Sequence, residues 1–199
     1  MAQVIEKLNQ NGFHAQFFSD ITSGVESLIA MIPEGARVGI GGSVTVRELD
    51  IINLLKQKGC TVVEHWTRQE EDDDHLRREA LSCEYYISSA NAITEAGHLV
   101  NIDGIGNRIA ALAYGPKVKF IVAGRNKIVK DLAAALWRIK NVAAPPNARR
   151  VGLPTPCAES GVCSECNSPN RICRAILILE RPPFRSRYHV FIFDKDLGF

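Results

Sequence analysis

The sequence predicts an α/β protein in which helices cover both faces of an open, mostly parallel β-sheet. Short apolar runs at residues 36–40, 60–64, 85–89 and 118–123 alternate with segments whose apolar residues recur at helical spacing. Strand–helix alternation of this kind is typical of open parallel sheets. The chain has 199 residues, of which 46% are hydrophobic and 23% charged, so it can bury a core.

The expected helices follow from apolar residues spaced three or four positions apart. In the third helix these residues are Val46, Leu49, Ile52 and Leu55, and Pro33 ends the helix before it. Helices are predicted at residues 4–8, 22–31, 46–58, 108–114 and 130–142, and the charged run 70–78 opens a further one.

The expected strands are runs rich in β-branched and aromatic residues. An extended link at 14–18 precedes the four apolar runs, and two late strands at 176–180 and 188–193 follow a cysteine-rich segment. We therefore divide the chain into an α/β domain at residues 1–145 and a cysteine-rich metal-binding segment with C-terminal strands at residues 146–199.

Charge and hydropathy exclude several classes of protein. The net charge of +2 is too small to predict a nucleic-acid partner, although residues 171–187 are locally basic. Residues 1–8 carry charge where a signal peptide needs an apolar run, and no stretch reaches the roughly 18 apolar residues that span a bilayer. We expect a cytoplasmic protein with reduced thiols.

A polar, glycine-containing stretch at residues 91–108 is the first candidate site. It is too polar for a core strand, and the alternative is a solvated hairpin followed by a loop. Ligands of parallel sheets bind at the carboxyl ends of the strands. We expect this stretch to meet the loops at 41–43 and 124–127 there. Its polar side chains are those of Asn91, Thr94, Glu95, His98, Asn101, Asp103, Asn107 and Arg108.

The second candidate is the glycine-rich junction at residues 39–45, between a strand and a helix. Glycines there let backbone amides approach a ligand, and Ser43 is placed to cap the helix. Unpaired N–H groups of a first helical turn attract a phosphate or a carboxylate. The junction matches neither a Walker loop nor the dinucleotide-binding glycine motif, and the alternative is a capped turn without a ligand.

The third candidate is a cluster of four cysteines with the spacing Cys-x5-Cys-x2-Cys-x6-Cys at 157–173. Four thiols this close in a reducing compartment predict a metal centre. Zinc and a [4Fe-4S] cluster are both compatible with four thiolates, and we favour the cluster. A redox pair at Cys163 and Cys166 is the alternative, whereas Cys60 and Cys83 fit buried core positions.

Four stretches also carry a family resemblance. They are Gly-Gly-Ser-Val-Thr at 41–45, Ser-Ser-Ala-Asn-Ala-Ile-Thr-Glu-Ala-Gly at 88–97, Asn-Ile-Asp-Gly-Ile-Gly-Asn-Arg at 101–108 and Val-Ala-Gly-Arg-Asn-Lys-Ile-Val at 122–129. Together they resemble the LUD, or lactate-utilisation, domain over roughly residues 1–145. The closest likeness is to stand-alone LUD proteins that end in a four-cysteine tail.

The resemblance implies the fold of ribose-5-phosphate isomerase, glucosamine-6-phosphate deaminase and the CoA transferases. In that fold the ligand edge binds phosphosugars, CoA or nucleotides. It also implies a role in oxidising L-lactate to pyruvate beside iron–sulfur subunits. Glu95 stands about where a CoA transferase has its glutamate. Asn91, which cannot ionise, replaces the aspartate of the sugar-phosphate isomerases, and an isomerase mechanism at that position is therefore in doubt.

Three hypotheses follow from these observations. The chain is a redox component of lactate-type organic-acid utilisation that binds a small anion, an isomerase or acyl-CoA transferase with a structural zinc, or a non-catalytic sensor. Expected partners are an organic acid, phosphosugar, CoA or nucleotide, an iron–sulfur redox protein and a second copy of the chain.

The catalytic candidate is Glu95. Candidate ligand-binding residues are Gly41, Gly42, Ser43, Thr45, Asn91, Thr94, Asp103, Gly104, Asn107, Arg108 and Lys127, and candidate metal ligands are Cys157, Cys163, Cys166 and Cys173.

Overall fold

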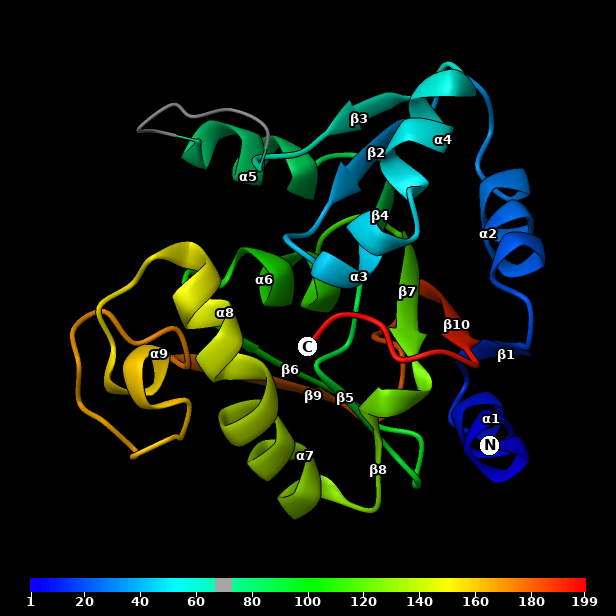
Figure 1. The fold of residues 1–199 in the computed structure, drawn as a ribbon. Coiled ribbons are helices and arrows are strands. Elements are labelled where there is room, and N and C mark those ends of the chain that lie inside the picture. The colour runs from blue at the N-terminus through cyan, green and yellow to red at the C-terminus, as the bar shows by residue number, and fades with distance from the viewer. Residues whose placement is uncertain (67–72) are drawn as a thin grey trace.

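A six-stranded, wholly parallel sheet forms the centre of the molecule (Figure 1). The computed structural model describes residues 1–66 and 73–199. The strand order is β1-β10-β7-β4-β2-β3. The predicted parallel sheet is thereby confirmed. Its strands are β1 (His14–Phe18), β2 (Arg37–Ile40), β3 (Thr61–Val63), β4 (Tyr85–Ser88), β7 (Val118–Gly124) and β10 (Arg187–Phe193).

Helices cover both faces of this sheet because successive residues of its strands point to opposite sides. On β7, Phe120 and Val122 face one core with α2 (Ile21–Ala30), α3 (Val44–Glu48) and α4 (Ile51–Gln57). Ile121 and Ala123 face the other core. That second core also takes side chains from α1 (Ala2–Gln10), α5 (Asp74–Leu81) and α6 (Asn107–Ala113).

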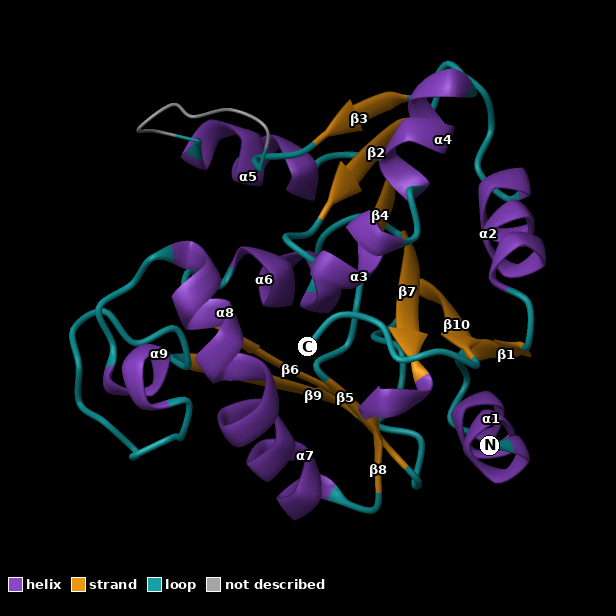
Figure 2. Ribbon diagram, viewed as in Figure 1, coloured by secondary structure: helices purple, strands orange, loops and turns teal. Residues whose placement is uncertain are grey.

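A second, four-stranded sheet packs against the same core as α1, α5 and α6 (Figure 2). It has the order β8-β5-β6-β9, and helix α7 (Leu132–Arg138) covers its other face through Ala135. The expectation that residues 91–108 are too polar for a core strand is wrong, because all of β6 is buried. The strands are β5 (Ala92–Thr94), β6 (Leu99–Asp103), β8 (Ile128–Val129) and β9 (Ala175–Leu179).

Several predicted boundaries differ from the structure. The single helix expected at 46–58 is broken at Asp50, whose backbone is left-handed with φ 53°. The helix expected at 130–142 continues through a π-helical turn, η2 (Ile139–Ala143), into α8 (Ala144–Val151). The start of the charged run 70–78 lies outside the described residues.

The boundary predicted at residue 145 does not separate two structural units. Strand β10 pairs with β1 and β7 in the centre of the main sheet, and β9 pairs with β6. Between α8 and β9 the cysteine-rich segment forms only a short helix, α9 (Pro156–Ser160). Within the described residues, no helix is long and apolar enough to cross a membrane.

Candidate functional site

A cavity of about 240 Å³ lies at the carboxyl-terminal edge of the parallel sheet. Loops after β2, β4, β6 and β7 reach it, together with η2, α8 and the residues after β10. This is the edge at which ligands of open parallel sheets bind. Nine of the predicted ligand-binding residues line the cavity, namely Gly42, Ser43, Thr45, Asn91, Asp103, Gly104, Asn107, Arg108 and Lys127.

Three other predicted residues do not line it. Gly41 is held against β4, where a side chain on residue 41 would collide with Ser88 Oγ. Thr94 Oγ1 accepts a hydrogen bond from His98 N (3.0 Å) inside the β5–β6 hairpin. Glu95 is exposed in the turn of that hairpin, and its backbone N–H donates to Val129 O. Glu95 is therefore not among the groups that meet in the cavity.

Lys127 is the most deeply buried cation of the cavity. The short helix η1 (Arg125–Lys127) follows β7 directly and turns this side chain inward, where the residue is only 3% exposed. Its Nζ donates to Thr45 Oγ1 (2.7 Å) and Ser89 Oγ (3.0 Å). Burial, helped by the nearby positive charge of Arg138, lowers the pKa of Lys127 to about 7. Ser89 was not predicted as a site residue, although it directly follows a strand.

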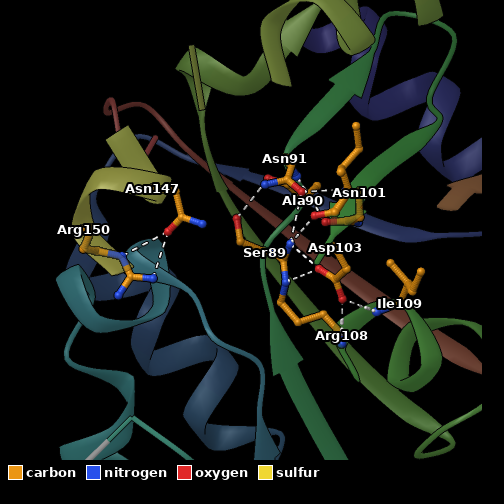
Figure 3. A network of polar contacts seen from close by, with 10 residues as sticks. Ser89, Ala90, Asn91, Asn101, Asp103, Arg108, Ile109, Asn147 and Arg150 are labelled. Atoms are coloured by element: carbon orange, nitrogen blue, oxygen red, sulfur yellow. Dashed lines mark hydrogen bonds and ion pairs between the residues drawn. The ribbon is translucent and has the colours of Figure 1, made fainter. Parts of the chain in front are cut away.

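Buried Asp103 and partly buried Arg108 form an ion pair at the end of β6 (Figure 3). Asp103 Oδ1 accepts from Arg108 Nε (2.7 Å), and Oδ2 accepts from the backbone N–H groups of Arg108 and Ile109. The carboxylate thus accepts from backbone N–H groups in the first turn of α6 and neutralises the charge of Arg108. Arg108, a predicted ligand-binding residue, is thus paired with Asp103 in the structure.

Two asparagines hold the β5–β6 hairpin beside this ion pair (Figure 3). Asn91 Oδ1 accepts from Ile102 N (3.0 Å) and from Arg108 Nη2 (3.3 Å), and Asn101 Oδ1 accepts from Asn91 N (3.2 Å). Polar side chains can be buried here because backbone and side-chain donors satisfy their oxygens. This explains how a polar stretch forms a core strand.

The glycine-rich junction is shaped by packing. Ser43 Oγ accepts from Val46 N (3.3 Å) and caps α3, as predicted. A Cβ on Gly42 would lie 2.6 Å from Trp66 Nε1, so the tryptophan ring requires the glycine there. Helix α3 has only five residues, and its macrodipole is correspondingly small. The junction contributes Gly42, Ser43 and Thr45 to the cavity wall.

Arg150 lies on α8 and lines the cavity together with Asn147. Its guanidinium stacks 4.1 Å from the centroid of the Trp66 ring and donates to Asn147 Oδ1 (2.8 and 3.0 Å). Within the described part of the chain, no carboxylate forms an ion pair with it. The sequence carried no signal for this residue, since α8 extends beyond the predicted helix.

Residues 197–199 close the cavity beside Lys127. Leu197 O accepts from Thr45 Oγ1 (3.4 Å), and Gly198 N donates to Glu48 Oε2 (2.7 Å). Phe199 lines the cavity, and its backbone oxygen accepts from Arg138 Nη1 (3.3 Å). These contacts keep solvent away from Lys127 and contribute to the burial that lowers its pKa.

The four clustered cysteines are not gathered around one point. Cys163 Sγ accepts from Glu165 N (3.5 Å), Cys173 Sγ accepts from Arg171 Nη2 (3.3 Å), and Cys157 Sγ lies 3.4 Å from a threonine hydroxyl. Within the described residues, no group of three or more His, Cys, Asp or Glu side chains is arranged to hold a metal ion. As arranged, the thiols do not fit a metal, and the metal centre stays a prediction.

Comparison with known proteins supports the architecture. A search of curated proteins finds no match. Among solved structures, the chain is similar to a DUF162 family protein from Deinococcus radiodurans, with 11% identity and a TM-score of 0.56 over 96% of this chain and 94% of that one. At this identity the likeness shows the fold alone. The sequence model of the LUD domain matches residues 1–193, well past the predicted boundary at 145. The chain therefore belongs to the LUD domain family.

Proposed function

We propose that this protein binds a small organic acid of the 2-hydroxy or 2-oxo carboxylate class in the cavity at the sheet edge. The observation that carries the proposal is the charge of the cavity wall. The Asp103 carboxylate is neutralised by Arg108, whereas Arg150 and Lys127 line the same cavity without a carboxylate partner among the described residues. With its pKa of about 7, Lys127 is charged in about half of the molecules at pH 7, so Arg150 is the main positive group of the wall. Burial lowers the pKa of His65, so this third basic group adds little charge at pH 7.

Such a wall favours an anion. Nε and Nη2 of Arg150 donate to Asn147 Oδ1, and the edge formed by Nη1 and Nη2 is the one that can donate two parallel hydrogen bonds to a carboxylate. Thr45, Ser89 and Asn91 add polar groups that suit a hydroxyl or oxo substituent beside the carboxylate.

The size of the cavity favours a small ligand. Its volume of about 240 Å³ lies below the roughly 300–1,000 Å³ of pockets that enclose drug-sized molecules. The LUD domain family is linked in general to lactate utilisation, which makes lactate and pyruvate the first ligands to test. Oxidation of lactate releases two electrons, so a redox role would need an acceptor, and the proposal here concerns binding.

Glu95 gains no support as a nucleophile for an acyl-CoA transferase or isomerase. Its side chain is exposed in a turn that packs against α1, where Asn11 Nδ2 donates to the backbone oxygens of Ala96 (2.9 Å) and Gly97 (3.1 Å). A base or nucleophile must lie within hydrogen-bond reach of its substrate. A ligand in the cavity would not contact this carboxylate, which does not line the cavity.

Calorimetric titration of the protein with lactate, pyruvate, inorganic phosphate and CoA tests the proposal. We expect lactate or pyruvate to bind, and Arg150→Gln to weaken that binding about 10- to 100-fold, the value of a charged hydrogen bond. Arg149→Gln is the matched control, because Arg149 lies on the same helix but donates to Ala158 O and does not line the cavity. Equal affinity of the two variants, or binding of CoA alone, would contradict the proposal.

A further inference from the structure

Lys127 has the surroundings of a reactive amine. Its Nζ lies in the cavity wall, between the hydroxyls of Thr45 (2.7 Å) and Ser89 (3.0 Å). Both hydroxyls line the same cavity. Within the described residues, no carboxylate forms an ion pair with Lys127. A lysine held only by hydroxyl groups keeps its lone pair available once it loses a proton.

Burial and the surrounding charges favour the neutral amine of Lys127. Burial is the main cause of the lowered pKa of Lys127, and the positive charges of Arg138 and Arg108 add to it, while Glu48 opposes it. With a pKa of about 7, about half of the molecules carry the neutral amine at pH 7. A lysine of ordinary pKa is neutral in only about one molecule in 2,500 at that pH. Desolvation beside cationic groups is a known way of activating an amine nucleophile.

We propose that Lys127 forms a reversible imine with the 2-oxo group of an oxo acid bound in the cavity, an inference that rests on the proposed function. The Nζ lone pair attacks the carbonyl carbon, and the carbonyl oxygen takes up a proton as the nitrogen loses one. The resulting carbinolamine expels this oxygen as water, and a C=N double bond replaces the C=O bond. Thr45 and Ser89 are placed to relay these protons, and Arg150 is placed to hold the carboxylate.

A second buried lysine supplies an internal control. Lys119 on β7 is fully buried, donates to Ser186 Oγ (3.0 Å) and has a pKa lowered by burial to about 8. It does not line the cavity, and its Nζ lies 5.0 Å from the centroid of the Tyr188 ring. The two lysines thus share burial, a serine partner and a lowered pKa, and they differ in access to the cavity.

The test is reductive trapping of the whole protein with pyruvate and sodium cyanoborohydride at pH 7. Hydride reduces an imine to a stable secondary amine, so the trapped chain gains the mass of pyruvic acid less one oxygen atom. Peptide mapping by mass spectrometry should place this adduct on Lys127 and not on Lys119. Lactate, which has no carbonyl group, should give no adduct. Lys127→Met should lose the adduct, whereas Lys119→Met should keep it.

The outcomes separate the two proposals. Binding of pyruvate in calorimetry without an adduct on Lys127 would overturn the imine and leave the binding proposal intact. Failure of both lactate and pyruvate to bind would overturn the binding proposal and the imine with it. An adduct spread evenly over exposed lysines would also overturn the imine. Because wild-type protein is mapped, the conclusion does not depend on the folding of Lys127→Met.

Discussion

Two buried lysines, at opposite ends of β7, have similar burial and hydrogen bonding but lie in different surroundings. Lys119 stands at the start of the strand, in register with Tyr86 and Tyr188, and Lys127 stands just after its end. Burial lowers the pKa of both side chains, to about 8 and about 7, and each donates to a serine hydroxyl at 3.0 Å.

The regions around the two lysines differ in packing. At the amino end, the Tyr188 ring lies against Lys119, and the Tyr188 hydroxyl donates to Leu112 O. At the carboxyl end, the loops after the strands diverge and leave a cavity beside Lys127. A buried amine with a lowered pKa therefore does not mark a binding site by itself. Access to a cavity makes the difference, and in a parallel sheet the carboxyl edge provides it.

The largest loss of stability is expected from removing the Asp103 carboxylate, which pairs with Arg108 at the carboxyl end of β6. Asp103→Ala removes the counter-ion of the partly buried Arg108 guanidinium, which keeps only Asn91 Oδ1 and Ile102 O as acceptors, and it leaves the backbone N–H groups of Arg108 and Ile109 without the carboxylate. We expect the free energy of unfolding to fall by about 3–5 kcal/mol, as for other broken buried ion pairs. Chemical denaturation measures this loss.

Asp131→Ala is the matched control for that change. Asp131 also caps a helix, accepting from Ala134 N (2.8 Å), but it is exposed. Its loss should cost about 1 kcal/mol. Changing Arg108 to Met in the Asp103→Ala background should recover part of the stability, since it removes the unpaired charge. Similar losses in the two aspartate variants would show that the carboxyl end is no more dependent on its buried charges than an exposed cap.

The pH dependence of stability sharpens the comparison of the two lysines. Each pKa is lower in the folded chain than in the unfolded chain, so the unfolded state binds more protons and stability rises with pH. This rise should begin near pH 7 for Lys127 and near pH 8 for Lys119, and end near 10.5 for both. It should not exceed about 1.4 kcal/mol per pH unit for each lysine.

Denaturant titrations across this pH range distinguish the contributions of Lys127 and Lys119 to the free energy of unfolding. Lys127→Met should flatten the curve from about pH 7 upward, whereas Lys119→Met should flatten it only above about pH 8. Glu48, Arg108 and Arg138 are the charged groups that act on Lys127. Identical curves for the two variants would contradict a difference between the two ends of β7.

The smallest effect on the cavity is expected from the cysteine-rich segment between α8 and β9, which borders it through Leu153, Ile172 and Cys173. If the four cysteines ligate one metal, Cys163→Ser and Cys173→Ser should each lose metal in anaerobically purified protein, measured by elemental analysis and visible absorbance. Cys60→Ser, at a buried core position, should keep it. Full metal content in both tail variants would refute the prediction, and metal removal should leave ligand affinity nearly unchanged.

Much of the fold was predictable because the relevant signals are local. The continuous apolar runs of β7 and β10, and the three- and four-residue spacing of apolar residues on α2, depend only on which faces of each element are buried. Polar residues such as Ser43, Asn91 and Lys127 follow strands, and the ends of parallel strands share one edge. That the loops carrying them meet there was therefore expected.

The sequence by itself determined the family, the parallel sheet and the edge at which the cavity lies. Only the tertiary structure decided that β10 lies between β1 and β7, that Arg150 joins Lys127 in one cavity, and that Glu95 lies outside it. The physical reason is the range of the interactions. Helical and strand periodicity arise from neighbouring residues, whereas strand order, burial of a cation and opening of a cavity arise from packing between residues far apart in the chain.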